Sequence, residues 1–297
     1  MKRRDRVSLA LSGRGLPDRV PWMELGVEPG LCRLLSKRAG ASAYDEHLGA
    51  LDALGIDVAT IDAGDLPRIA RFRSETDYFV LAMTGGVFYD SATRMGFERF
   101  LAATKNRRDE VRRVLSEAAR LNEKRSLAAL DAGAHGVIVA DDIAHARGPF
   151  VSPCDFRDLV LPFYEVLAGE IRGRGGFALF HSDGDVEMML EDIISAGFQG
   201  IHSLQPSAGL DLASLKRAYG DRICLIGNVE LEDAANLPSA ADIEMAVAEA
   251  VSVGAPGGRF ILSTSSGVLR EAMGLARVLA YRDACRRLLH RYGSDRA

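Results

Sequence analysis

From residue 106 onward, short apolar runs alternate with segments of helical periodicity, and this alternation limits the fold more than any other feature of the chain. The runs are short enough for strands that are covered on both faces, and they lie at 135–140, 176–180, 200–204, 222–227 and 258–263. Helical patterns lie around them, at 106–132, from Ser152 onward, and at 186–196, 211–219, 239–253 and 268–291. This order predicts parallel strands that are joined by helices.

The N-terminal third adds further strands to this series. Apolar runs at 19–25 and 56–62 predict two strands, and residues 68–90 predict a hairpin followed by one more strand. About eight strands with a small N-terminal hairpin are typical of a single (β/α)8 barrel, a TIM barrel, which would span residues 1–297. A doubly wound open sheet is the alternative fold, but neither GxGxxG nor GxxxxGK[ST] follows any predicted strand.

Composition and charge narrow the class of protein. Of the 297 residues 47% are hydrophobic, and the formal net charge is −4. The densest basic patch, "KNRRDEVRR" at 105–113, interleaves acids at helical spacing, which indicates a solvated helix face rather than a nucleic-acid surface. No apolar run reaches the roughly 18 residues of a membrane span, and "VSLAL" near the N-terminus is too short for a signal peptide. The four cysteines form no CxxC pair. We expect a cytoplasmic protein without nucleic-acid or membrane partners.

Polar residues follow most of the predicted strands, at the end where barrel enzymes bind their ligands. We predict four of them as catalytic: His181, Asp183, Asp141 and Asp142. We predict others as substrate contacts: Glu24, Trp22, Asp62, His202, Gln205, Asn228 and Ser265. So many carboxylates at one mouth are unfavourable unless a cation, a metal or protonation offsets their charge.

Several of these residues also have a structural interpretation. Asp141 and Asp142 can cap the following turn, and one can be structural while the other faces the pocket. His202 lies inside its strand, where a hydrogen-bonded core histidine is the commoner role. Asn228 can hold a turn, and Glu24 can form a salt bridge instead of a pocket wall.

Five segments in order carry a resemblance to a known family: "RDRVSLALSGRGLPDRVPW", "DAGAHGVIVADDIAHARGPFVSPCDFRDLVLPFY", "FHSDGDV", "LQPSAGLDLASLKRAYGDRICLIGNVEL" and "GAPGGRFILSTSSGV". Over nearly its whole length the chain resembles the uroporphyrinogen decarboxylase superfamily, in particular its branch of corrinoid-dependent methyltransferase-like proteins. The resemblance implies a (β/α)8 barrel with its pocket at the C-terminal ends of the strands.

The residues typical of the family's two best-known activities are altered here. The R-x-x-x-R motif of decarboxylases is absent from "MELGVEPGLCRLLSKR", where only Arg33 and the Lys37–Arg38 pair follow. The zinc methyltransferases use H-x-C and a second cysteine; His181 matches their histidine, Asp183 stands at the first cysteine, and Ser265 or a neighbouring hydroxyl at the second. Nitrogen and oxygen ligands from His181, Asp183 and Asp142 would suit zinc or another divalent metal ion.

Three functions therefore stay open. The first is a methyltransferase or demethylase that moves a methyl group between a small methylated substrate and a corrinoid. A separate protein would carry that corrinoid, since the barrel accounts for the whole sequence. The second is a carboxy-lyase without cofactor that acts on a porphyrinogen or a smaller carboxylate, and the third is a barrel that binds a small ligand without turnover. A homodimer through the last helix is a further option.

Overall fold

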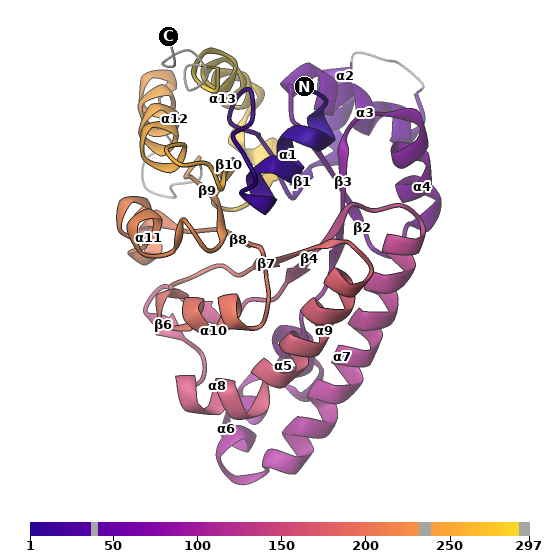
Figure 1. Cartoon of the computed structure of the whole chain (residues 1–297), viewed down its shortest axis with the longest axis vertical. Coiled ribbons are helices and arrows are strands. Elements are labelled where there is room, and N and C mark those ends of the chain that lie inside the picture. The colour runs from indigo at the N-terminus through magenta and orange to yellow at the C-terminus, as the bar shows by residue number, and fades with distance from the viewer. Residues whose placement is uncertain (37–40, 232–238, 291–297) are drawn as a thin grey trace.

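A seven-stranded parallel sheet forms the centre of the computed structural model, which describes residues 1–36, 41–231 and 239–290 (Figure 1). In sheet order the strands are β10 (Phe260–Thr264), β9 (Cys224–Val229), β8 (Gly200–His202), β7 (Phe177–His181), β4 (Gly136–Ala140), β3 (Phe79–Thr84) and β2 (Val58–Asp62). All five strands that we predicted after residue 106 are present and parallel. The sheet is curled, and helices cover its outer face.

The predicted strand at 19–25 is present only as a single bridge between Trp22 and Leu262 of β10. Met23 N donates to Leu262 O at 3.0 Å, and Leu262 N donates to Pro21 O at 2.9 Å. On the other side, Asp57 N, just before β2, donates to Trp22 O at 2.8 Å. Because Pro21 has no N–H to donate, the ladder cannot extend in that direction. Within the described ranges the sheet thus has seven strands and a bridging segment between its two outermost strands, rather than eight strands.

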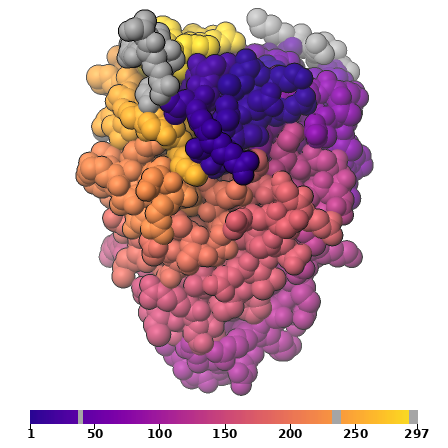
Figure 2. All heavy atoms as spheres, viewed as in Figure 1, coloured from indigo at the N-terminus to yellow at the C-terminus, as the bar shows by residue number. Residues whose placement is uncertain are grey.

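Helices connect the strands and lie around the sheet: α1 (Arg3–Ser12), α2 (Pro29–Ser36), α3 (Ala43–Leu54), α4 (Leu66–Glu75), α5 (Val87–Met95), α6 (Phe97–Asn106), α7 (Arg108–Asp131), α8 (Pro153–Leu159), α9 (Leu161–Gly173), α10 (Leu190–Ser195), α11 (Leu212–Tyr219), α12 (Ala240–Gly254) and α13 (Leu275–Leu288). The predicted start at Ser152 is confirmed, since its Oγ accepts a hydrogen bond from Asp155 N at 3.1 Å. Helices α5 to α9 build the narrow end of the molecule, which is the lower end in Figure 2.

The hairpin that we predicted within residues 68–90 is wrong. This segment contains most of α4, then β3 and the start of α5. Asp65 accepts a hydrogen bond from Arg68 N at 3.2 Å, Pro67 lies in the first turn, and Ile69 and Phe72 bury one face of α4. Cap and proline together start a helix here. A small antiparallel pair lies instead after β4, between β5 (Ala144–His145) and β6 (Gly148–Pro149).

Helix α1 covers the N-terminal ends of the strands. Its Val7 and Leu11 are buried in one cluster with Val58, Phe79 and Ile261, which lie at or near the starts of their strands. This packing closes one end of the curled sheet, and ligand chemistry is therefore expected at the C-terminal ends. Among the described helices, none combines the length and apolarity that a membrane span requires.

Candidate functional site

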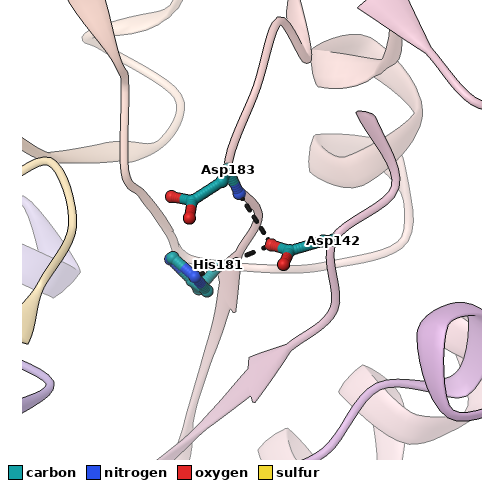
Figure 3. A group of neighbouring side chains, drawn as sticks. All are labelled: Asp142, His181 and Asp183. Atoms are coloured by element: carbon teal, nitrogen blue, oxygen red, sulfur yellow. Dashed lines mark hydrogen bonds and ion pairs between the residues drawn. The ribbon is translucent and has the colours of Figure 1, made fainter. Parts of the chain in front are cut away.

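Two neighbouring strands bring a histidine and two carboxylates together at their C-terminal ends. Ala140 of β4 pairs with His181 of β7, so Asp142 and Asp183 leave the sheet side by side. One potential ligand atom from each of Asp142, His181 and Asp183 lies within 4.8 Å of the other two (Figure 3). His181 Nε2 is 3.8 Å from Asp142 Oδ1, and Asp183 N donates to the same oxygen at 2.8 Å. The structure therefore brings together the three residues that the sequence suggested as metal ligands; we call them the Asp142–His181–Asp183 cluster.

A chain of hydrogen bonds fixes which nitrogen of His181 faces this cluster. His202 Nε2 lies 3.0 Å from Thr264 O, and because a carbonyl can only accept, this nitrogen carries the proton. The neutral His202 then accepts at Nδ1, where His181 Nδ1 lies 2.7 Å away and donates. His181 Nε2 is left with a free lone pair that is directed at Asp142, as in the outer-shell arrangements that orient metal-binding histidines.

The electrostatics of the cluster favour a cation or a proton between its members. Burial lowers the pKa of His181, which keeps the imidazole neutral and able to bind a metal or accept a proton. Burial also raises the pKa of Asp183, and the nearby charge of Asp142 raises it further. The lone pair of His181 Nε2 and the two carboxylates repel one another unless a positive charge lies between them. One imidazole nitrogen and two carboxylate oxygens fit zinc or another divalent ion of intermediate hardness.

Asp141 lies outside the cluster. Its buried carboxylate accepts from Phe88 N at 2.8 Å, from Tyr89 N at 2.7 Å and from the Tyr164 hydroxyl, so it caps the first turn of α5. Burial raises its pKa to about 6. A Cβ at Gly86 would lie 2.0 Å from its Cγ, which explains a glycine before the helix. Of the two aspartates, one is structural and the other faces the site, as the sequence left open.

Glu24, Trp22 and His202 are buried and belong to a hydrogen-bond network that ends at His181. Glu24 is 3% exposed and accepts from Trp22 Nε1 at 2.9 Å and from the Tyr281 hydroxyl at 3.2 Å. Ser263 Oγ lies 3.3 Å from Glu24 Oε2 and 3.0 Å from His202 Nε2, which connects the two networks. Burial raises the pKa of Glu24 to about 7. These side chains thus contact protein groups, where we had predicted direct substrate contacts. His202 holds His181 directly, and Glu24 is connected to His202 through Ser263.

Asp62 and Gln205 are held by neighbouring groups. Asp62 is exposed and forms an ion pair with Arg125 at 2.8 Å. Gln205 Oε1 accepts from Gly184 N at 3.2 Å, which secures the loop that carries Asp183. A Cβ at Gly184 would lie 2.7 Å from the backbone of Ala144, so this loop needs glycine there.

Asn228 lies in β9, and Ser265 directly follows the neighbouring strand β10. Asn228 lines a cavity of about 320 Å³ between the end of β9 and helices α11 and α12. Ser265 is buried, and its N–H donates to Val229 O at 2.9 Å. Neither residue is part of the Asp142–His181–Asp183 cluster.

Two residues of the site had no assigned role in our sequence analysis. Ser263 joins Glu24 to His202, and the positive charge of Arg270 lowers the pKa of Asp183 against the effect of burial. Ser263 is the last residue of the strand that we predicted at 258–263, and only the folded contacts distinguish it from the hydroxyl residues that follow it. The Lys37–Arg38 pair of the sequence analysis lies outside the described residues.

The comparison with protein families agrees with this architecture. The model of the family described as uroporphyrinogen decarboxylase (URO-D) matches residues 64–288. The chain belongs to the uroporphyrinogen decarboxylase family. No curated protein matches the sequence.

Solved structures resemble this uroporphyrinogen decarboxylase family member in fold. A methyltransferase from Methanosarcina mazei superposes with a TM-score of 0.79 at 17% identity, covering 97% of this chain and 99% of that one. D-psicose 3-epimerase from Clostridium cellulolyticum H10 gives a TM-score of 0.49 at 11% identity, covering 90% and 96% of the two chains. The match to the family model confirms the family resemblance inferred from the sequence motifs. The match to the methyltransferase shows a shared fold over nearly the full length of both chains.

Proposed function

We propose that this protein transfers a methyl group between a small methylated substrate and a corrinoid that a separate protein carries. The observation that carries the proposal is the Asp142–His181–Asp183 cluster, with a free lone pair on His181 Nε2, at the C-terminal ends of β4 and β7. The methyltransferase of similar fold supports this choice within the family. The cluster supplies a place for the positive charge that such a reaction needs.

The residues act on the heteroatom that bears the methyl group. The bond that breaks joins the methyl carbon to the substrate's O, N or S atom, and its electron pair stays on that heteroatom. The bond that forms would join the methyl carbon to the Co(I) centre of the partner protein's corrinoid, which supplies both bonding electrons. A divalent ion held by His181, Asp142 and Asp183 would polarise the heteroatom as a Lewis acid. Without an ion, His181 Nε2 would first take up a proton from solvent on its free lone pair, with Asp142 at 3.8 Å stabilising the imidazolium, and would then donate this proton to the developing negative charge. His202 holds the ring of His181 in the required orientation in both cases.

A carboxy-lyase that acts on a porphyrinogen or a smaller carboxylate is the second candidate. Such a substrate needs several fixed cations around its carboxylates. At this cluster, Arg270 is a cation that acts on Asp183, whereas the cluster itself contributes two carboxylates. The charge at the site therefore favours methyl transfer over decarboxylation of a polycarboxylate.

Methyl transfer can be tested with cob(I)alamin as the acceptor and a panel of methylated amines, alcohols and thiols as donors. The wild-type protein is expected to form methylcobalamin, followed by its visible spectrum, with at least one donor class. Asp142→Asn removes a ligand charge and is expected to reduce the rate by roughly 100-fold. Asp185→Asn, in the same loop after β7, is the matched control and should keep the rate within about twofold.

Metal content is measured on the same three proteins by elemental analysis after purification without chelator. A stoichiometric divalent ion in the wild type that is lost in Asp142→Asn supports the metal-assisted route. Methyl transfer without any bound ion supports His181 as the proton donor. Absence of methyl transfer with every donor, together with release of CO₂ from a carboxylate substrate, would favour the carboxy-lyase. Ligand binding without either reaction would favour a non-catalytic barrel.

A further inference from the structure

A second cavity, of about 250 Å³, lies at the C-terminal end of β2 and is separate from the Asp142–His181–Asp183 cluster. Its walls come from β1 (Gly26–Val27), α2, α3, β2 and α4. Strand β3 lies between β2 and β4, so the two sites are about 10 Å or more apart along the sheet. We call this space the Arg68 cavity, after the cation that lines it.

Two nitrogen atoms in the wall of the Arg68 cavity are buried without a hydrogen-bonding partner. They are Nδ1 of His47, a residue that is only 9% exposed, and Nε of Arg68. In contrast to Nε, Arg68 Nη2 has a hydrogen-bonding partner, because it donates to Ala43 O at 3.2 Å. A buried polar atom without a partner is destabilising, and in native proteins it commonly marks a place for a bound polar group. One N–H of a guanidinium and one imidazole nitrogen together suit the two oxygens of a carboxylate.

The acidic residues that line the Arg68 cavity differ in whether they have a partner in the protein. Asp62 is paired with Arg125, and Asp65 accepts the N–H of Arg68 as the cap of α4. Within the part of the chain that the structure describes, the carboxylate of Glu46 has no such partner. Burial raises the pKa of the Cys32 thiol to about 11, and the charges of Glu46 and Arg68 shift this pKa in opposite directions. Both charged side chains therefore lie near Cys32, in the wall of the same cavity.

We propose that the Arg68 cavity binds a small zwitterion of the amino-acid class. Its carboxylate accepts from Arg68 Nε and from His47 Nδ1, and its ammonium group faces Glu46. A simple anion would leave Glu46 uncompensated beside it, and a simple cation would face Arg68. The volume equals roughly eight waters, which is enough for an amino acid with a short side chain. The site does not depend on the proposed methyl transfer.

Binding is tested by titrating the full chain with glycine, acetate or methylammonium while the ring signals of His47 are followed by NMR. We expect a saturable shift with glycine, at a dissociation constant at least about tenfold lower than with acetate or methylammonium. Arg68→Met keeps the aliphatic stem and is expected to weaken glycine binding at least about tenfold. Arg71→Met, one turn away on α4, is the matched control, since Arg71 pairs with Glu75 and stacks on Tyr44 outside the cavity.

Protection of Cys32 from iodoacetamide, resolved by peptide mass spectrometry, gives a second readout. Glycine is expected to slow this alkylation, and Glu46→Gln should reduce the protection even if Arg68→Met does not fold. A saturable shift that acetate produces as strongly as glycine overturns the zwitterion assignment. Equal glycine binding by Arg68→Met and Arg71→Met, or no saturable shift at all, overturns the site. Because neither measurement requires a corrinoid or a metal, these failures are separate from a failure of the proposed function.

Discussion

His181 is held in one tautomer by contacts that begin three strands away, at Thr264 of β10. Thr264 O determines the proton position on His202, and His202 determines it on His181. Burial lowers the pKa of both histidines, so a neutral pair is the stable state of this network. The buried carbonyl of Thr264 thus leaves His181 Nε2 unprotonated, so that this nitrogen can bind a metal ion or accept a proton.

Glu24 gives this buried network a measurable pH dependence. Its folded-state pKa of about 7 lies above its ordinary value of 4.5, so the folded protein binds this proton more tightly than the unfolded chain. The stabilising contribution is complete below about pH 4.5 and is lost as the pH rises to about 7, by roughly 3 kcal/mol. Glu24→Gln is expected to remove that part of the decline in unfolding free energy, measured by urea denaturation across this range.

Glu98→Gln, on the exposed face of α6, is the control and should keep the wild-type pH profile. Asp141 titrates in an overlapping range because its pKa is about 6, so the comparison uses the difference between variant and wild type at each pH. A Glu24→Gln protein with the wild-type slope would show that the carboxyl is not protonated in the fold.

Two adjacent aspartates after β4, Asp141 and Asp142, have different roles. The chain leaves β4 at Ala140, and Asp141 turns under the first turn of α5 while Asp142 turns toward β7. Side chains of consecutive residues point to opposite sides of an extended segment. One aspartate therefore caps a helix, and the next reaches the site.

Replacing Asp141 should affect stability far more than ligand binding. Asp141→Ala leaves the N–H groups of Phe88 and Tyr89 and the hydroxyl of Tyr164 without their buried acceptor. We expect a loss of about 3 kcal/mol in unfolding free energy. Asp142→Asn is the matched variant at the next position, and it should change the unfolding free energy by less than about 1 kcal/mol in the absence of metal. Equal destabilisation by both variants would contradict this division of roles.

Closure of the curled sheet depends on contacts from the N-terminal segment. Asp57 is fully buried at the start of β2; its Oδ1 accepts from Arg6 and Arg19 at 2.7 Å each, and its Oδ2 accepts from Trp22 N at 3.0 Å. One carboxylate thus joins α1, the loop after it and the bridging segment to the sheet. Helix α1 and the bridge to β10 form a single structural unit with β2.

Asp57→Asn tests this closure. The change leaves two buried guanidinium groups without their counter-charge, and we expect a loss of about 3–5 kcal/mol in unfolding free energy. Limited proteolysis should then cut within the first 25 residues before the rest of the chain. Asp52→Asn removes a carboxylate that is 54% exposed and pairs with Arg3, so it should cost less than about 1 kcal/mol. Unchanged protease resistance in Asp57→Asn would show that closure rests on apolar packing alone.

The sequence by itself determined the β/α order, the family, and the placement of His181, Asp183 and Asp142 at the C-terminal ends of their strands, because apolar period, strand ends and sequence motifs are local properties. The helix over residues 68–75 begins at a local cap and a proline that our prediction of a hairpin overlooked. Only the tertiary structure decided that the segment at Trp22 forms one bridge, and that Asp141 and Glu24 are buried and hydrogen-bonded to protein groups. These outcomes depend on partners far along the chain, such as Tyr164 for Asp141 and Tyr281 for Glu24. Local periodicity cannot encode which distant donors reach a carboxylate, and those donors determine whether it faces substrate or the core.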